Sequence, residues 1–229
     1  MSVGRYSKII KEIKFINIEL LQIRKLIFFV LLICFSGAMV YFINYSFYTE
    51  QIFFNTYSDQ LAFERIEKIF NAQERNKWIG YLLLPLLLYV KVLYNTCAVT
   101  TGSLLSDSRA GFKSNFNVCL KAEYVFVIML FVKFLALSFF KEVDTLDDLS
   151  FMPGSLANLY KVTELPKWAV YPLQTINIWE ILFCWVGTTL YALQFDVSKA
   201  MAFQRFCIPY LIGLFIWILV VVFITLQFS

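Results

Sequence analysis

The sequence contains no histidine, and charged residues make up only 16% of its 229 residues. Histidine is the usual general base of enzymes and the commonest metal ligand, so both roles lose their most frequent residue. Soluble domains carry about 25% charged residues. A soluble protein this poor in charge would not cover its surface with polar groups, so the composition argues for a membrane protein.

The spacing of the cysteines indicates neither disulfides nor a metal site. The five cysteines lie inside apolar segments or near their ends: Cys34, Cys97, Cys119, Cys184 and Cys207. The two long polar loops contain none of them, which argues against a disulfide framework outside the cell. The CxxC spacing of a zinc site is also missing. We interpret the five as isolated buried thiols and expect no bound metal.

Motifs for catalysis or nucleotide binding are missing as well. The sequence has no P-loop and no GxGxxG, and no serine is accompanied by a histidine that would activate it. An acidic run holds Glu142, Asp144, Asp147 and Asp148. It is either a weak site for a divalent cation or a solvated loop face, and we favour the loop. We therefore expect no enzyme and no cofactor.

What the sequence has in abundance is hydrophobic residues, which make up 60% of it, and aromatic residues, which make up 19%. A helix needs about 20 apolar residues to cross the hydrocarbon core of a bilayer. Five stretches approach that length: 26–44, 78–100, 124–140, 176–195 and 207–226. The prediction is an all-α polytopic membrane protein, with residues 26–229 forming a five-helix transmembrane domain.

The first 25 residues form a separate N-terminal segment. Its isoleucines and leucine recur at helical spacing, with lysines on other faces, which predicts an amphipathic helix at an anionic membrane surface. The alternative is that the segment extends the first transmembrane helix or packs on a partner. No small-residue cleavage site follows promptly, so the first span is expected to stay as an anchor.

Two further features concern the second span. The loop before it carries apolar residues on one side of 58–73, which predicts a surface helix lying against the membrane. Pro85 lies inside the second span and should kink it. Residues 101–123 are mostly polar and predict a short connection to the third span.

The distribution of charge predicts the orientation. The N-terminal segment and the connections 101–123 and 196–206 together hold 11 Lys and Arg against 5 acidic residues. The two long loops, 45–77 and 141–175, hold 7 against 10. The positive-inside bias therefore places the N-terminus in the cytoplasm and the C-terminus outside.

Charged residues inside the spans are the candidate functional residues. Lys91 lies 9 residues from Thr100, and Lys133 lies 10 residues from Glu123, so both are expected at about 14–15 Å from the cytoplasmic edge. A charge in mid-bilayer costs on the order of 2.5 to 3.5 kcal/mol, so each lysine needs a partner, water or neutralisation. Glu180 is the one acid that we expect within a span.

These three charges allow several interpretations. If the helices touch, Glu180 would pair with Lys133, and Lys91 would face a lipid phosphate, an anionic ligand or water. Alternatively both lysines snorkel to the membrane surface, or pair within the bundle or with a partner subunit.

The last two spans also resemble a known family. Residues 177–219 read NIWEILFCWVGTTLYALQFDVSKAMAFQRFCIPYLIGLFIWIL, and the stretch before the third span reads GSLLSDSRAGFKSNFNVCLKAEYV. This is similar to the Yip (Ypt-interacting protein) family of five-span membrane proteins, over roughly residues 78–226. The matching positions are Asn177, Trp179, Trp185, Gly187, Ser198, Lys199 and Ala200, with Gly111, Phe112 and Lys113 in the connection.

The resemblance implies a five-helix fold with a cytosolic N-terminus. The Asp-Leu-x-Gly-Pro motif of eukaryotic members is absent, so binding of small GTPases and vesicle trafficking are not implied. Abundant Phe, Ile, Lys and Asn suit an AT-rich bacterial genome, which favours a bacterial inner-membrane protein.

The functional hypothesis is a non-enzymatic interaction or assembly factor, or an accessory subunit of a larger membrane complex. Its expected partners are membrane lipids and other membrane subunits or further copies of the chain, with no nucleic acid. The alternative is a small transporter or channel-like protein that binds an anion at Lys91 and Lys133. The lack of obvious inverted repeats argues against this alternative.

Overall fold

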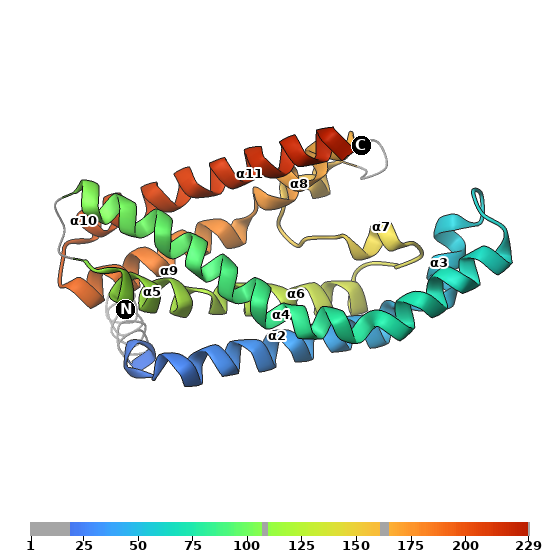
Figure 1. The fold of residues 1–229 in the computed structure, drawn as a ribbon, viewed down its shortest axis with the longest axis horizontal. Coiled ribbons are helices and arrows are strands. Elements are labelled where there is room, and N and C mark those ends of the chain that lie inside the picture. Colours follow the sequence, from blue (N-terminus) through green and yellow to red (C-terminus); the bar gives the residue numbers. More distant parts are fainter. Residues whose placement is uncertain (1–18, 107–109, 161–164, 229) are drawn as a thin grey trace, which may run out of the picture. The chain divides into compact units, whose positions relative to one another are not determined.

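The computed structural model describes residues 19–106, 110–160 and 165–228 (Figure 1). Regular structure in these ranges is helical, apart from one isolated β-bridge between Ser155 and Asn177. The longer helices are α2 (Lys25–Phe47), α3 (Glu50–Tyr57), α4 (Phe63–Leu105), α5 (Phe112–Ala122), α6 (Tyr124–Phe139), α8 (Lys167–Thr175), α9 (Ile178–Phe195) and α11 (Ile208–Phe228). Short elements are α7 (Leu146–Leu149), η1 (Leu156–Leu159), α10 (Lys199–Ala202) and the π-helical η3 (Phe203–Cys207).

Five helical segments in the described ranges are long and apolar enough to cross a membrane. They are Lys25–Phe47, Phe63–Leu105, Phe112–Phe139, Ile178–Phe195 and Lys199–Phe228. The predicted fold class, an all-α membrane protein with five spans, is therefore confirmed. The predicted N-terminal segment 1–25 falls mostly outside the described residues, which begin at residue 19.

The second span differs from the prediction. The expected surface helix at 58–73 and the expected span at 78–100 belong to one helix, α4, which has 43 residues. The change from charged to apolar composition near Trp78 does not interrupt the backbone hydrogen bonds, and α4 continues through Pro85. At 1.5 Å per residue this helix is about 64 Å long, roughly twice the thickness of the hydrocarbon core.

The third span also starts earlier than predicted. Residues 101–123 are not a polar connection, because α4 continues to Leu105 and α5 begins at Phe112. Only Glu123 separates α5 from α6, so Glu123 lies inside the third candidate span. The statement that Glu180 is the one acid within a span is therefore wrong. Composition suggested a loop because the helix has polar side chains, yet Asn115, Asn117 and Lys121 are buried.

The chain forms two compact units. Unit 1 comprises Met1–Leu31, Val90–Tyr124 and Ile181–Trp217, and unit 2 comprises Leu32–Tyr89, Val125–Glu180 and Ile218–Ser229.

Unit 1 is packed around large aromatic side chains and small residues. The rings of Phe183 and Tyr210 lie 4.7 Å apart, and both side chains are buried. Gly187 lies against Phe206, where an added Cβ would fall 2.0 Å from the ring. Small residues thus let the neighbouring helices approach closely, as expected for helix packing in membranes.

Unit 2 contains the polar loops, which are tied to helices. Phe53 of α3 is 1% exposed and packs edge-on against Phe70 of α4, so α3 is anchored to the beginning of α4. Gly154 has a φ of 74°, a conformation that favours glycine, and an added Cβ there would lie 2.6 Å from Ile178. Its carbonyl accepts a hydrogen bond from the Ile178 amide, which attaches this loop to the start of α9.

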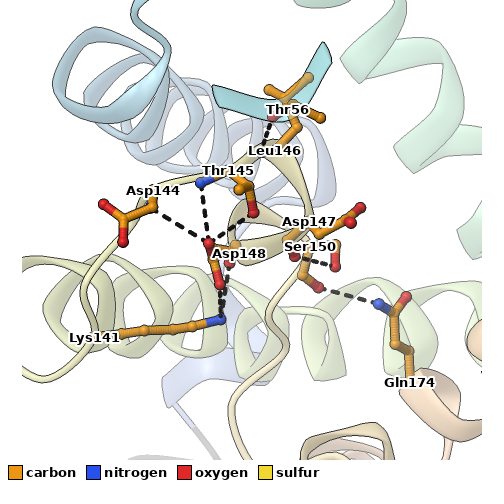
Figure 2. Close-up of polar contacts among 9 residues, drawn as sticks. All are labelled: Thr56, Lys141, Asp144, Thr145, Leu146, Asp147, Asp148, Ser150 and Gln174. Carbon is orange, nitrogen blue, oxygen red and sulfur yellow. Dashed lines mark hydrogen bonds and ion pairs between the residues drawn. The ribbon is translucent and has the colours of Figure 1, made fainter. Parts of the chain in front are cut away.

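The acidic run belongs to a hydrogen-bonded loop of unit 2 (Figure 2). Asp148 Oδ2 accepts hydrogen bonds from the amide and the hydroxyl of Thr145, at 3.0 and 2.8 Å, and caps the single turn of α7. Asp148 Oδ1 lies 3.1 Å from Lys141 Nζ. The Leu146 amide donates to Thr56 Oγ1 of α3, and Gln174 of α8 donates to the Ser150 carbonyl. Asp148 therefore organises the loop.

Candidate functional site

Unit 1 contains a partly buried ion pair that joins two spans. Lys91 Nζ on α4 lies 2.8 Å from Glu123 Oε2, and Asn95 Nδ2 donates to Glu123 Oε1 at 3.3 Å. Lys91 and Asn95 are four residues apart, so both reach the same side of the helix. Glu123 is placed by the joint between α5 and α6. We call Lys91, Asn95 and Glu123 the polar cluster of unit 1.

The charges in this cluster differ in their access to solvent. The Glu123 side chain is 1% exposed, whereas the Lys91 side chain is 40% exposed. A buried carboxylate is costly unless a cation and hydrogen bonds compensate it. Glu123 has both, and the charge of Lys91 is balanced within the chain.

A second set of polar side chains links three helices of unit 1. Asn115 Nδ2 of α5 donates to Thr100 Oγ1 at 3.1 Å, and its Nδ2 lies 3.5 Å from Ser103 Oγ. Ser103 Oγ is hydrogen-bonded to Tyr191 OH of α9 at 3.0 Å. Hydrogen bonds of this kind hold transmembrane helices together when their packing surfaces are otherwise apolar. The set therefore fixes α4, α5 and α9 relative to one another.

Some buried polar atoms of unit 1 have no hydrogen-bond partner. Among the described residues these are Asn115 Oδ1, Lys121 Nζ and Thr188 Oγ1. Lys121 is 0% exposed, and the nearby charge of Lys25 repels it. Burying a polar group without a hydrogen-bond partner costs free energy, so Lys121 destabilises the helix bundle.

The predicted site residues are divided between the two units. Lys91 belongs to unit 1 and pairs with Glu123, whereas Lys133 belongs to unit 2 and is half-buried on α6. Lys133 and Glu180 both belong to unit 2, and the suggested pair between them stays a prediction. Glu180 lies in the first turn of α9, and its amide donates to Asn177 Oδ1 at 2.9 Å.

Sequence reasoning missed Glu123, Asn95 and Asn115. A signal for Asn95 was available, because it follows Lys91 by four residues, one helical turn. The signal for Asn115 was the apolar residues that follow it. In the structure every residue of 115–122 except Phe116 is buried. The prediction of a loop over 101–123 ignored the helical spacing of its apolar residues, so Glu123 was not expected to lie within a helical span.

A groove runs along the surface of unit 1 between α4 and α11. It has a volume of about 450 Å³ and is lined by Tyr94, Cys97, Ala98, Thr101, Gly102 and Leu105 of α4, and by Ile208, Pro209, Ile212, Gly213 and Ile216 of α11, among others. Its floor is made of small residues in close contact. An added Cβ on Gly102 would lie 1.9 Å from Pro209 Cγ, and one on Gly213 would lie 2.9 Å from Ala98. We call this feature the helix groove.

The described residues contain no group of three or more His, Cys, Asp or Glu side chains that would hold a metal ion. Comparison with known proteins adds no assignment: no family model, no curated protein and no solved structure matches the chain.

Proposed function

We propose that the chain is a non-enzymatic integral membrane protein that acts as an interaction or assembly factor, or as an accessory subunit of a larger membrane complex. The observation that carries this proposal is the helix groove of unit 1. The small side chains at Ala98, Gly102 and Gly213 leave space in the groove. Small residues are the usual contact points between transmembrane helices. A membrane-spanning helix of a partner subunit, or of a second copy of the chain, is the occupant that suits this surface.

The polar cluster of unit 1 supports the same proposal. The charges of Lys91 and Glu123 balance within the chain, and Asn95 adds a hydrogen bond to the carboxylate. Such a cluster stabilises the bundle. Binding of a partner is then the role of the bundle surface.

The proposal includes a location and an orientation. We propose a bacterial inner membrane, a Yip-like five-span architecture, a cytoplasmic N-terminus and an external C-terminus. The support is the excess of Lys and Arg in the N-terminal segment and short connections. A C-terminal alkaline phosphatase fusion should be active and a C-terminal green fluorescent protein fusion dark; the opposite pattern would reverse the orientation.

Filling the groove tests the proposed function. Thr101 is exposed and lines the groove, so Thr101→Trp should block a partner helix without disturbing the core. The control is Val90→Trp, at a position of α4 that is 50% exposed and outside the groove. Tagged wild-type chain purified in mild detergent should retain a stoichiometric companion, which the Thr101 variant loses by about tenfold or more and the control keeps. A strictly monomeric wild type, or equal retention by both variants, contradicts the proposal.

A further inference from the structure

Unit 2 holds a cavity of about 720 Å³ between the end of α2 and the first half of α4. Four tyrosines line it: Tyr41, Tyr45, Tyr48 and Tyr81. The rest of the lining consists of three amide side chains, the ion pair of Glu74 with Lys77, and Phe70 and Gly80. We call this feature the tyrosine cavity.

The cavity lies where the apolar runs of both helices end. On α2 its lining begins at Tyr41, about one turn before the end of the apolar stretch that starts at Leu26. On α4 it ends at Tyr81, just inside the apolar stretch that starts at Trp78. The change from apolar to polar side chains marks the level of the lipid headgroups, and tyrosine and tryptophan are enriched there. A ligand at this level comes from the membrane surface.

Two phenol groups of the cavity accept hydrogen bonds from amide side chains. Gln73 Nε2 donates to Tyr48 OH at 2.7 Å, and Asn44 Nδ2 donates to Tyr81 OH at 3.3 Å. A hydroxyl that accepts one hydrogen bond keeps its own proton for another acceptor. Phosphate oxygens are strong acceptors, and Lys77, which also lines the cavity, would add a charge-assisted bond.

The cavity also has a place for a positive charge. Glu74 Oε2 lies 2.6 Å from Lys77 Nζ, so the lining carries one charge of each sign. The rings of Tyr41 and Tyr45 are stacked with their centroids 6.0 Å apart, and Tyr45 is 78% exposed. Tyrosine faces attract cations, and a carboxylate accepts hydrogen bonds from an ammonium group.

From these features we propose that the tyrosine cavity binds the phosphoethanolamine headgroup of a phospholipid. The phosphate accepts from Tyr48, Tyr81 and Lys77, and the ammonium group is held by Glu74 and the faces of Tyr41 and Tyr45. Because the lining is balanced in charge, it favours a zwitterionic headgroup over an anionic one. Choline has no N–H group to donate a hydrogen bond to Glu74, so the cavity should prefer ethanolamine to choline headgroups.

The first test compares lipids on the purified full-length chain in mild detergent. Lipids with identical acyl chains and ethanolamine, choline or glycerol headgroups are added, and the unfolding temperature and bound lipid are measured. Phosphatidylethanolamine should raise the unfolding temperature most and be retained best. Equal effects of the three lipids, or a preference for phosphatidylglycerol, overturn the proposal. Soluble phosphoethanolamine binding as tightly as the lipid would overturn the assignment to a membrane lipid.

Glycine variants localise the binding. An added Cβ on Gly80, which lines the cavity, would meet nothing within 4 Å, so Gly80→Leu fills the space without a clash at the backbone. Gly37 on α2 has the same open surroundings but lies outside the cavity, so Gly37→Leu is the matched control. Gly80→Leu should weaken binding of phosphatidylethanolamine about tenfold or more, and the control should not. Equal binding by both variants overturns the proposal.

A charge variant provides a second test that does not depend on the folding of the Gly80 variant. Lys77 is 53% exposed, so Lys77→Gln should leave the fold intact. It should remove the preference for phosphatidylethanolamine over a neutral lipid without a phosphate, such as diacylglycerol. An unchanged preference contradicts the role given to Lys77.

Discussion

Lys91 Nζ lies 2.8 Å from Glu123 Oε2 and supplies the countercharge of a carboxylate that is 1% exposed. This pair joins the second and third spans at the place where α5 gives way to α6.

Removing one member of the pair should destabilise the protein more than removing both. Lys91→Met leaves the Glu123 carboxylate buried without its cation, and Glu123→Gln leaves Lys91 without its anion. Each should cost about 1–3 kcal/mol, below the 3–5 kcal/mol of a fully buried pair, because Lys91 is 40% exposed. The double variant should recover part of the loss, which a double-mutant cycle of unfolding in detergent would measure. Additive losses would mean that the two side chains do not interact.

Lys121 should be replaceable by an apolar residue with a gain in stability. Its ammonium is fully buried, has no hydrogen-bond partner among the described residues and is repelled by Lys25. Lys121→Met should therefore raise the free energy of unfolding by about 1–3 kcal/mol. Lys113→Met is the control, because Lys113 is exposed on the same helix and should change stability by less than about 0.5 kcal/mol. A loss of stability in the Lys121 variant would indicate that this lysine has a stabilising partner in the membrane.

Gly102 should not tolerate even a methyl group. An added Cβ would lie 1.9 Å from Pro209 Cγ, and the proline ring has little freedom to move away. Gly102→Ala should destabilise the contact between α4 and α11 by about 1–3 kcal/mol. Gly37→Ala, where a Cβ meets nothing within 4 Å, should be neutral or stabilising by up to about 1 kcal/mol, as helix propensity favours alanine. Thermal unfolding of the two variants side by side tests this difference.

The α9 cap should depend on the side-chain oxygen of Asn177. Asn177 Oδ1 accepts a hydrogen bond from the Glu180 amide, and its Nδ2 donates to the carbonyls of Gln174 and Thr175. Asn177→Ala should cost about 1 kcal/mol or more. Asn177→Asp keeps the oxygen acceptor and loses the two donated bonds, so an intermediate loss is expected. Equal losses in the two variants would show that the cap contributes nothing.

Asp148 should make the loop of unit 2 sensitive to acid. Burial raises the pKa of Asp148, but hydrogen bonds from Thr145 and Lys141 and the charge of Lys141 outweigh it, so this pKa lies below its ordinary value. A lowered pKa contributes stability above the ordinary pKa of about 3.9, and that stability is lost as the pH falls through the folded-state pKa. Asp148→Asn should be less stable than wild type at neutral pH, with the difference shrinking in acid. Hydrogen exchange of residues 144–150 measures this, and a constant difference at all pH values would contradict it.

The number of spans could be predicted because the length of an apolar run decides whether a helix crosses a bilayer. The run 207–226 has few interruptions, and α11 (Ile208–Phe228) matches it closely. The ends of the spans were harder to predict, because helices continue beyond the apolar part. The segment before Trp78 is charged but remains helical, since nothing in it breaks the backbone hydrogen bonds.

The polar cluster was only half predictable. Lys91 is conspicuous in an apolar run, but Glu123 lies at the edge of a polar stretch where a charge needs no explanation. Which acid meets which lysine depends on helix packing, and helix packing depends on close contacts such as Gly187 with Phe206. One sequence does not reveal such contacts.

The loop around α7 has a consequence for handling the protein. Lys141 is held by Asp148, Leu146 is bonded to Thr56, and Ser150 is bonded to Gln174 (Figure 2). A protease cuts a segment only after it opens locally, and these contacts oppose that opening. Trypsin added to intact cells or to inverted vesicles should therefore spare the bond after Lys141, even where it reaches that side of the membrane.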